Sequence, residues 1–226
     1  MIVLVCLESL SPSLASRAAL RLACNMGDKA EVVVVSAGGT ADSASFQLAR
    51  QYAAVRRIVH LNHPTLNKAD FVTLGMILAE TARHLGARVI FTGEHSDGEG
   101  QGMVPAALAH HLRAPLFARV ADVQLPATDN EALLLTVHSG GRLCTVTSPL
   151  PAVLATPPAI AADGANLAEA RQSSPAVETL TLAQLGMDAS RLVPRPNLLG
   201  TLVAKAAQTV QHKSFDEAAH LLLQGQ

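Results

Sequence analysis

Short, continuously apolar runs alternate with segments in which large apolar residues recur every three or four positions through the first 115 residues. Uninterrupted apolar runs are typical of parallel strands that are covered on both faces. The three- to four-residue recurrence indicates amphipathic helices. The alternation therefore predicts stacked βαβ units and a parallel sheet, with strands at Ile2–Leu7, Glu31–Ser36, Arg57–Leu61 and Arg88–Thr92.

Capping residues predict where the helices begin. Ser11 can cap a helix that has Pro12 at its first position and that buries the stripe Leu14, Ala18, Leu22 and Met26. A shorter helix is expected over residues 40–52, with its apolar positions at Ala44, Leu48 and Tyr52. Asn67 can cap a third helix that ends at Gly86, and the apolar positions of this helix are Phe71, Leu74, Leu78 and Leu85.

After Pro115 the pattern changes to strand-like runs separated by turn residues, which predicts hairpins. The runs expected to extend the sheet are Phe117–Leu125, Leu133–His138 and Leu143–Thr147, followed by a further central strand at Ala152–Thr156. Residues 157–175 are rich in Ala, Pro, Gly and Ser and predict an exposed excursion. The fold class is therefore α/β, with a Rossmann-like, mostly parallel sheet, helices on both faces, extra antiparallel strands and an extended C-terminal tail.

This pattern divides the chain into an α/β domain, residues 1–180, and a C-terminal arm, residues 181–226. The arm holds a proline-broken stretch at Arg191–Leu202 and a helix expected from Ser214 to Leu223. Because the central part of the arm lacks periodicity, we expect it to pack on another subunit.

Charge is sparse in this chain: charged residues make up 15% of it, with 17 Lys and Arg against 18 Asp and Glu. The basic residues are scattered singly, which argues against nucleic acid as a partner. No apolar run approaches the roughly 18 residues of a membrane span. One explanation of the sparse charge is a surface that is buried against another subunit. An ordinary alanine-rich core would explain it equally well. Three cysteines without a C-x-x-C motif, and an N-terminus without a basic leader, predict a reducing cytoplasm.

A glycine-rich loop joins the fourth predicted strand to a helical pattern that opens near Met103. Its glycines stand at 93, 98, 100 and 102, where a strand end and a helix N-terminus together attract an anion such as a phosphate. The G-x-G-x-x-G fingerprint would need glycine at 103, and the loop has no lysine for a Walker motif. A loop that binds no ligand remains the alternative.

Metal and hydrolytic chemistry find little support in the sequence. His95, His110 and His111 are close along the chain, but adjacent histidines on a helix point to different sides and no further ligands accompany them. Ser139-Gly140-Gly141 predicts a turn, because it does not match G-x-S-x-G. We therefore predict no metal site and no hydrolytic serine nucleophile; that the chain has no catalytic residue at all is what the family resemblance described below implies.

Three segments that follow predicted strands can form one crevice at the carboxyl edge of the sheet. Cys6 to Ser9 follow the first strand, Ser36 to Gly39 the second, and Gly93 to Val104 the fourth. Together they favour an adenine-nucleotide site.

The chain resembles the beta subunit of electron transfer flavoproteins at Phe91–Pro105, Leu150–Thr156 and Leu182–Asp188, in the right order and at the right distances. The resemblance implies a sheet of the adenine nucleotide alpha hydrolase-like kind and an electron carrier rather than an enzyme. It also implies a heterodimer with an alpha subunit that holds most of a redox-active FAD, and a flavin dehydrogenase as electron donor. The beta crevice would hold AMP as a structural ligand, or a second FAD in electron-bifurcating members.

The same resemblance places the nucleotide contacts of this chain. With the crevice segments, the candidate set is Cys6, Ser9, Ser11, Ser36, Ala37, Gly38, Gly93, Asp97, Gly100, Gln101, Gly102, Met103 and Val104. Main-chain N–H groups and Gln101 would hold the phosphate, because this chain lacks hydroxyl side chains at 102–104. Partner recognition would fall on residues 160–171, with Gly164, Asn166 and Leu167 at its centre.

Two other classes of protein remain as alternatives. A stand-alone nucleotide-binding protein of the universal-stress type shares a related fold, but Gly93 to Gly102 lacks the glycine spacing of its phosphate loop. An adenine-nucleotide hydrolase or ligase would need a catalytic group in this loop, where Asp97 and Glu99 are available.

Overall fold

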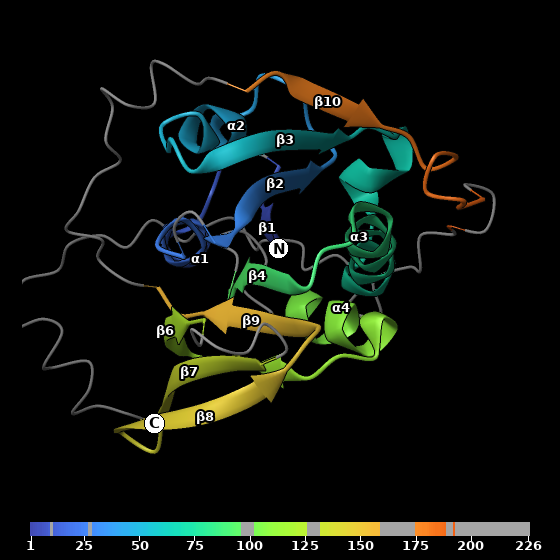
Figure 1. The fold of residues 1–226 in the computed structure, drawn as a ribbon. Helices are drawn as coiled ribbons and strands as arrows, with labels where there is room; N and C mark the ends of the chain where they lie inside the picture. Colours follow the sequence, from blue (N-terminus) through green and yellow to red (C-terminus); the bar gives the residue numbers. More distant parts are fainter. Residues whose placement is uncertain are drawn as a thin grey trace, which may run out of the picture. The chain divides into compact units, whose positions relative to one another are not determined.

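The computed structural model describes residues 1–9, 11–26, 29–95, 102–125, 132–158, 175–188 and 192. Seven strands form one sheet in which all hydrogen-bonded neighbours are parallel. They are β1 (Ile2–Leu7), β2 (Glu31–Ala37), β3 (Val55–Leu61), β4 (Val89–Gly93), β5 (Leu116–Phe117), β9 (Ala152–Thr156) and β10 (Val177–Leu180). Their order is β10-β3-β2-β1-β4-β9-β5, with β1 in the middle (Figure 1). The predicted parallel sheet is confirmed.

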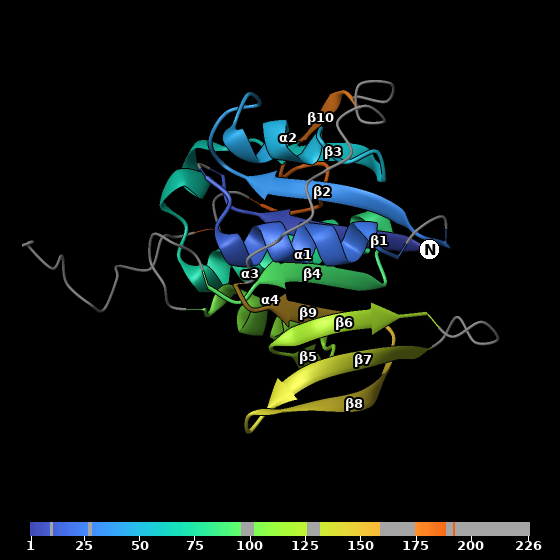
Figure 2. The same ribbon diagram turned by 90° about the vertical axis from the view of Figure 1, so that its left-hand side faces the viewer.

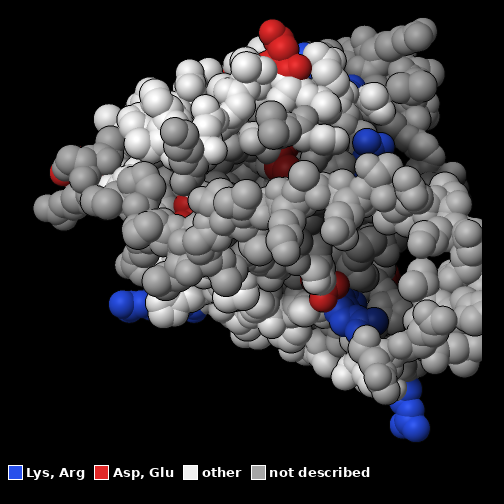
Figure 3. All heavy atoms as spheres, turned by 180° about the vertical axis from the view of Figure 1, so that it is seen from behind, with Lys and Arg blue, Asp and Glu red and all other residues white. Residues whose placement is uncertain are grey.

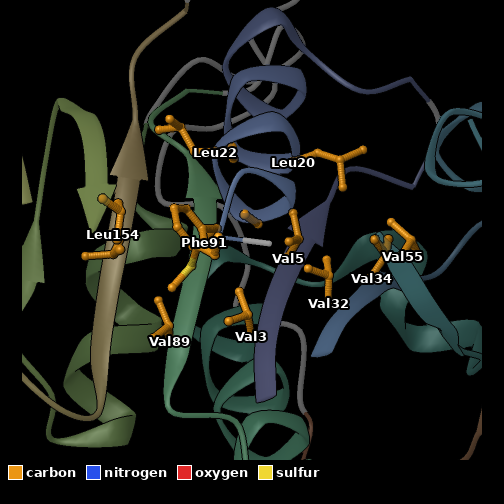
Figure 4. Close-up of a cluster of buried hydrophobic side chains, with 14 of the residues drawn as sticks. Val3, Val5, Leu20, Leu22, Val32, Val34, Val55, Val89, Phe91 and Leu154 are labelled. Atoms are coloured by element: carbon orange, nitrogen blue, oxygen red, sulfur yellow. The ribbon is translucent and has the colours of Figure 1, made fainter. Parts of the chain in front are cut away.

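Helices cover both faces of this sheet. One face packs against α1 (Leu14–Cys24) and α2 (Ala44–Ala49), the other against α3 (Phe71–Leu85) and α4 (Val104–Leu112) (Figure 2). Successive residues of β1 alternate between the two, so that Val5 packs towards α1 and Leu4 towards α3. Figure 4 shows the cluster on the α1 side, where Leu20 and Leu22 lie above Val5 and Phe91.

The remaining strands form a second, antiparallel sheet. It consists of β6 (Val120–Gln124), β7 (Ala132–Ser139) and β8 (Arg142–Pro149). The predicted hairpins are present, but they do not extend the parallel sheet as expected. The run Phe117–Leu125 is not one strand, because the chain turns at Arg119, whose φ is 57°. The inner residues of the new sheet join the core on the α1 side: Val120, Val123, Leu133 and Leu135.

Helix starts were predicted less well than strands. The N-cap of α1 is Ser13, not Ser11, so the helix begins two residues later than expected, and Leu14 is 53% exposed. The N-cap of α3 is Asp70, whose Oδ1 accepts a hydrogen bond of 2.7 Å from the Thr73 N–H. Asn67 lies instead in a 3₁₀ turn, η2 (Pro64–Lys68). Gly86 does end α3, with a left-handed φ of 69°.

The face of α2 also differs from the expectation. This helix is only six residues long, and Ala44 is exposed. Its buried residues are Ser45, Phe46 and Ala49.

β10 adds a strand that the sequence did not predict. It pairs with β3, and the Arg57 guanidinium on β3 holds the Glu178 carboxylate on β10 through bonds of 3.0 and 2.9 Å. Leu182 and Leu192 then lie in the core on the α3 side. The predicted division at residue 180 stays a prediction, and Ser214–Leu223 lies outside the described residues. None of the helices in the described ranges is long and apolar enough to cross a membrane.

Gly75 allows the close packing of α3 on α4. A Cβ at this position would lie 2.5 Å from Ala107 Cβ and 2.8 Å from the Leu108 backbone nitrogen.

In a helix interior, alanine is more stable than glycine by about 1 kcal/mol. The backbone clash nevertheless predicts that Gly75→Ala lowers the free energy of unfolding, by about 1–3 kcal/mol, as measured by urea titration. His84→Ala, an exposed change on the same helix, should stay within about 0.5 kcal/mol of the parent. A stabilised Gly75→Ala variant would contradict this packing.

Candidate functional site

The strand order reverses at β1. From β1 the chain continues through β2 and β3 on one side, and then returns to β4 on the other side. In open parallel sheets this reversal opens a crevice at the carboxyl ends of the strands, which is the usual ligand site. Ser36 pairs with Leu7, and Thr92 pairs with Cys6, so the ends of β2 and β4 flank the end of β1. The loops after β1, β2 and β4 therefore start at the same edge, as the sequence predicted.

Glycines let these loops pack closely on the rest of the protein. A Cβ at Gly38 would lie 2.7 Å from Asn67 Oδ1, which accepts a hydrogen bond of 2.9 Å from the Gly39 N–H. A Cβ at Gly39 would meet the Ser9 carbonyl oxygen at 3.1 Å, and one at Gly93 would meet Ser16 Oγ at 2.8 Å. These contacts join the loop after β2 to η2 and to the loop after β1, and they join the end of β4 to α1. These glycines serve close contacts within the protein.

The N-terminus of α1 is satisfied from within the chain. Ser13 Oγ accepts a hydrogen bond from the Ser16 N–H (3.1 Å) and lies 2.7 Å from the Glu8 carboxylate. Ser13 Oγ is also 3.2 Å from the His95 carbonyl oxygen, which ties the loop after β4 to the same helix end. Because Glu8 already places a negative charge here, a phosphate at this end would meet electrostatic repulsion.

The N-terminus of α4 has a different environment. Its N-cap is Met103, and no side chain of the described residues caps it. Met103 is 43% exposed. Gly102 precedes it with φ 59°, and a Cβ there would lie 2.7 Å from the Glu94 carbonyl oxygen. A helix end with N–H groups that lack side-chain acceptors favours an anion, so the start of α4 suits an anion better than the start of α1 does.

Two hydroxyl groups beside β1 are buried without a partner among the described residues. They are Ser36 Oγ and Thr92 Oγ1, on residues that are 1% and 4% exposed. Ser36 continues the row of Val32 and Val34 on the α1 side, whereas Thr92 is next to Phe91 and so belongs to the opposite face. A buried hydroxyl without a hydrogen bond costs about 1–3 kcal/mol. Both hydroxyls could therefore form a hydrogen bond with a ligand or a water molecule at the strand ends.

The other predicted site residues fall into three groups. Cys6 is buried in the core on the α3 side, and burial raises the pKa of its thiol to about 12, so it offers an apolar contact and no thiolate. Ser9 and Ala37 are half-buried at the crevice edge, and Ser11 is exposed. The rest lie outside the described residues: Asp97, Gly100, Gln101, Gly164, Asn166 and Leu167.

Sequence reasoning missed several residues that shape this edge. Glu8 is the most important, because its carboxylate bonds Ser13 and its carbonyl oxygen accepts a hydrogen bond from Ser45 Oγ on α2. Thr92 was treated only as the end of a strand. Nothing in the spacing of Glu8 and Ser45 could have indicated their contact, because 37 positions separate them.

Charge and metal ligands add nothing further at this edge. Within the described ranges, no three His, Cys, Asp or Glu side chains lie close enough together to hold a metal ion. Figure 3 views the molecule from behind relative to Figure 1. The charged side chains of the described residues are scattered on this face and form no broad basic patch.

A groove lies elsewhere, between the C-terminal ends of α3 and α4, lined in part by Met76, Arg83, His111 and Arg113. Burial lowers the pKa of His111, and the neighbouring His110 lowers it further. These helix ends lie at the amino edge of the parallel sheet, because each helix leads back to the start of the next strand. The groove is therefore separate from the crevice.

The two candidate caps of α1 give a matched pair of variants. Ser13→Ala removes the acceptor of the Ser16 N–H and should lower the free energy of unfolding by about 1 kcal/mol. Ser11→Ala removes an exposed hydroxyl and should change it by less than about 0.5 kcal/mol. Denaturant titration of both variants decides the assignment, and a larger loss at Ser11 would reverse it.

Comparison with known proteins agrees with this architecture. A family model described as "Electron transfer flavoprotein domain" matches residues 4–185. The chain is also similar to the protein named "Electron transfer flavoprotein subunit beta" of Methylophilus methylotrophus, with 29% identity over 162 residues. The match covers 71% of this chain and 61% of that relative, so the chain spans about three fifths of the relative's length. The resemblance read from the sequence is confirmed, and the chain belongs to the electron transfer flavoprotein domain family.

Proposed function

We propose that this chain is the beta subunit of a heterodimeric electron transfer flavoprotein, which carries electrons from flavin dehydrogenases towards an electron-transfer chain. The observation that carries the proposal is the extent of the family match. It spans residues 4–185 and so covers the strands from β1 to β10, apart from the first two residues of β1. A shared crevice motif alone would match only a short part of the fold.

In electron transfer, the proposed role of this chain is to hold and orient the subunit that carries the flavin. An alpha subunit would carry most of the FAD, which supplies the redox chemistry when it is bound. The beta chain would contribute a wall of the complex and the surface that the dehydrogenase recognises. We assign this recognition to residues 160–171, with Gly164, Asn166 and Leu167 at its centre. No covalent step is assigned to a residue of this chain.

The crevice would hold AMP as a structural ligand. The residues present fit such a group at α4, where the N–H groups of Gly102, Met103 and Val104 can face a phosphate. The hydroxyls of Ser36 and Thr92, at the ends of β2 and β4, have no hydrogen-bond partner among the described residues. The N-terminus of α1 is less suited to a phosphate, because Glu8 and Ser13 already occupy it.

A stand-alone adenine-nucleotide-binding protein is the second candidate. The same uncapped α4 and the same strand-end hydroxyls would serve it equally well. The two candidates differ in whether the chain binds an alpha subunit and flavin.

Cofactor content after co-expression tests the leading proposal. The chain is produced together with the alpha subunit, the complex is purified, and acid-released FAD and AMP are counted per heterodimer. One FAD and one AMP are expected. Two FAD and no AMP would place the second flavin in the crevice. A chain that purifies alone, without flavin, would overturn the assignment and favour the stand-alone nucleotide-binding protein.

The strand-end hydroxyls give a test of the crevice itself. Thr92→Val and Ser36→Ala remove hydrogen-bonding groups with little change of shape. If these hydroxyls contact the nucleotide, each change should weaken AMP binding by roughly 2- to 10-fold, because a typical hydrogen bond contributes about 0.5–1.5 kcal/mol. The measurement is calorimetric titration of the nucleotide-stripped complex with AMP.

Thr81→Val is the matched control for Thr92→Val. Thr81 is buried in α3 and its hydroxyl donates to the Ile77 carbonyl oxygen at 2.8 Å. This change should leave the AMP affinity unaltered. Unchanged affinity in both strand-end variants would show that the nucleotide does not use them.

A further inference from the structure

Glu8 places a negative charge at the N-terminus of α1. It is the first residue after β1, and its carboxylate accepts hydrogen bonds from Ser13 Oγ (2.7 Å) and from the Ser13 N–H (3.4 Å). Its carbonyl oxygen accepts a further hydrogen bond from Ser45 Oγ on α2. Contacts with two helices therefore hold Glu8 at the carboxyl edge of the sheet, where the crevice begins.

This carboxylate has no cationic partner in the described part of the chain. The ion pairs there join Arg57 to Glu31 and Glu178, and Arg83 to Glu80. The charge of Glu8 is balanced instead by its hydrogen bonds and by the positive end of the α1 dipole. A carboxylate that is not paired with a cation repels a second anion that approaches the same helix end.

Packing connects the start of α4 with the start of α1. A Cβ on Gly102, just before α4, would lie 2.7 Å from the Glu94 carbonyl oxygen and 3.7 Å from the His95 side chain. The His95 carbonyl oxygen is in turn 3.2 Å from Ser13 Oγ, the group that donates to Glu8. The two helices cover opposite faces of the sheet (Figure 2), and their starts contact the same two residues.

A buried hydroxyl supports a ligand on the α4 side of the crevice. Thr92 is 4% exposed, and its Oγ1 has no hydrogen-bond partner among the described residues. Thr92 pairs with Cys6 and, like Cys6 and α4, belongs to the face opposite α1. An uncapped helix end and an unpartnered hydroxyl on the same face suit one phosphate group.

The length of the phosphate chain matters because the two helix ends are not equivalent. A nucleoside monophosphate needs only the start of α4. A diphosphate carries additional negative charge, and the other helix end that could receive it already holds the Glu8 carboxylate. A second phosphate that extends across the crevice from α4 would therefore approach a like charge rather than a set of donors.

We propose that Glu8 is a specificity residue, which makes the crevice select a nucleoside monophosphate over a nucleoside diphosphate or triphosphate. The inference rests on the proposed nucleotide site and specifies the class of ligand that this site takes. Glu8 acts through its charge and does not need to touch the bound monophosphate. Its hydrogen bonds to Ser13 and Ser45 keep that charge in place.

The affinities for AMP and ADP test this role. The full chain, in the assembly in which it purifies, is stripped of nucleotide and titrated calorimetrically with each nucleotide in the presence of EDTA. The parent should bind AMP more tightly than ADP by roughly 5- to 20-fold, as expected for one nearby like charge. Glu8→Gln should strengthen ADP binding by roughly the same factor and alter AMP binding by less than about 3-fold. Raising the salt concentration should reduce the preference of the parent.

Two further variants separate charge from structure. Glu8→Asp keeps the charge and should keep the preference for AMP. Glu31→Gln removes a carboxylate at the start of β2, at the amino edge of the sheet, and should leave both affinities unchanged. Urea titration checks that Glu8→Gln is folded, as expected because its amide oxygen can still accept from Ser13 Oγ.

The outcomes distinguish this inference from the proposed function. An AMP-to-ADP affinity ratio that Glu8→Gln leaves unaltered would overturn the role of Glu8, although the nucleotide site would stand. Equal strengthening of AMP and ADP binding would also overturn it, because the charge would then act on any nucleotide. A protein that binds neither nucleotide would overturn the proposed site itself, and the role of Glu8 with it.

Discussion

Burial of β1 on both faces is the constraint on which the rest of this fold depends. Val3, Leu4 and Val5 are fully buried, with neighbouring parallel strands on either side and a helix layer above and below. Each such side chain contributes about 1.5–3 kcal/mol when it leaves water. Because β1 is central and comes first, later strands can add only at its two sides. That arrangement produces the reversal of strand order, and open parallel sheets usually bind ligands where the order reverses.

The crevice is asymmetric because its two helix ends are satisfied differently. Glu8 and Ser13 close the N-terminus of α1 with groups from the chain itself. α4 begins at Met103 without a side-chain cap in the described part of the chain. The contacts at Gly38, Gly39 and Gly93 hold the surrounding loops in place, so this asymmetry is built into the packing. An anion at this edge would therefore meet less repulsion at α4 than at α1.

The sequence was sufficient to predict the parallel sheet and the edge at which the loops after β1, β2 and β4 start, because both follow from local patterns several residues long. Continuous apolar runs identified β1, β2, β3 and β4, and the ends of parallel strands necessarily meet at one edge. Caps were predicted less well, since several capping residues stand within a few positions of each helix start. Ser13 is preferred to Ser11 because Glu8 and the His95 carbonyl group meet it in space. Contacts of this kind have no periodic signal.

A sparsely charged chain can still use its few charges to fix geometry. Arg57 and Glu178 join β3 to β10 through two bonds, although both are partly exposed and such a pair contributes at most about 1 kcal/mol. The pair therefore contributes more to fixing the register of β10 against β3 than to the stability of the fold. β10 has only four residues, and a paired guanidinium specifies which neighbour each residue meets.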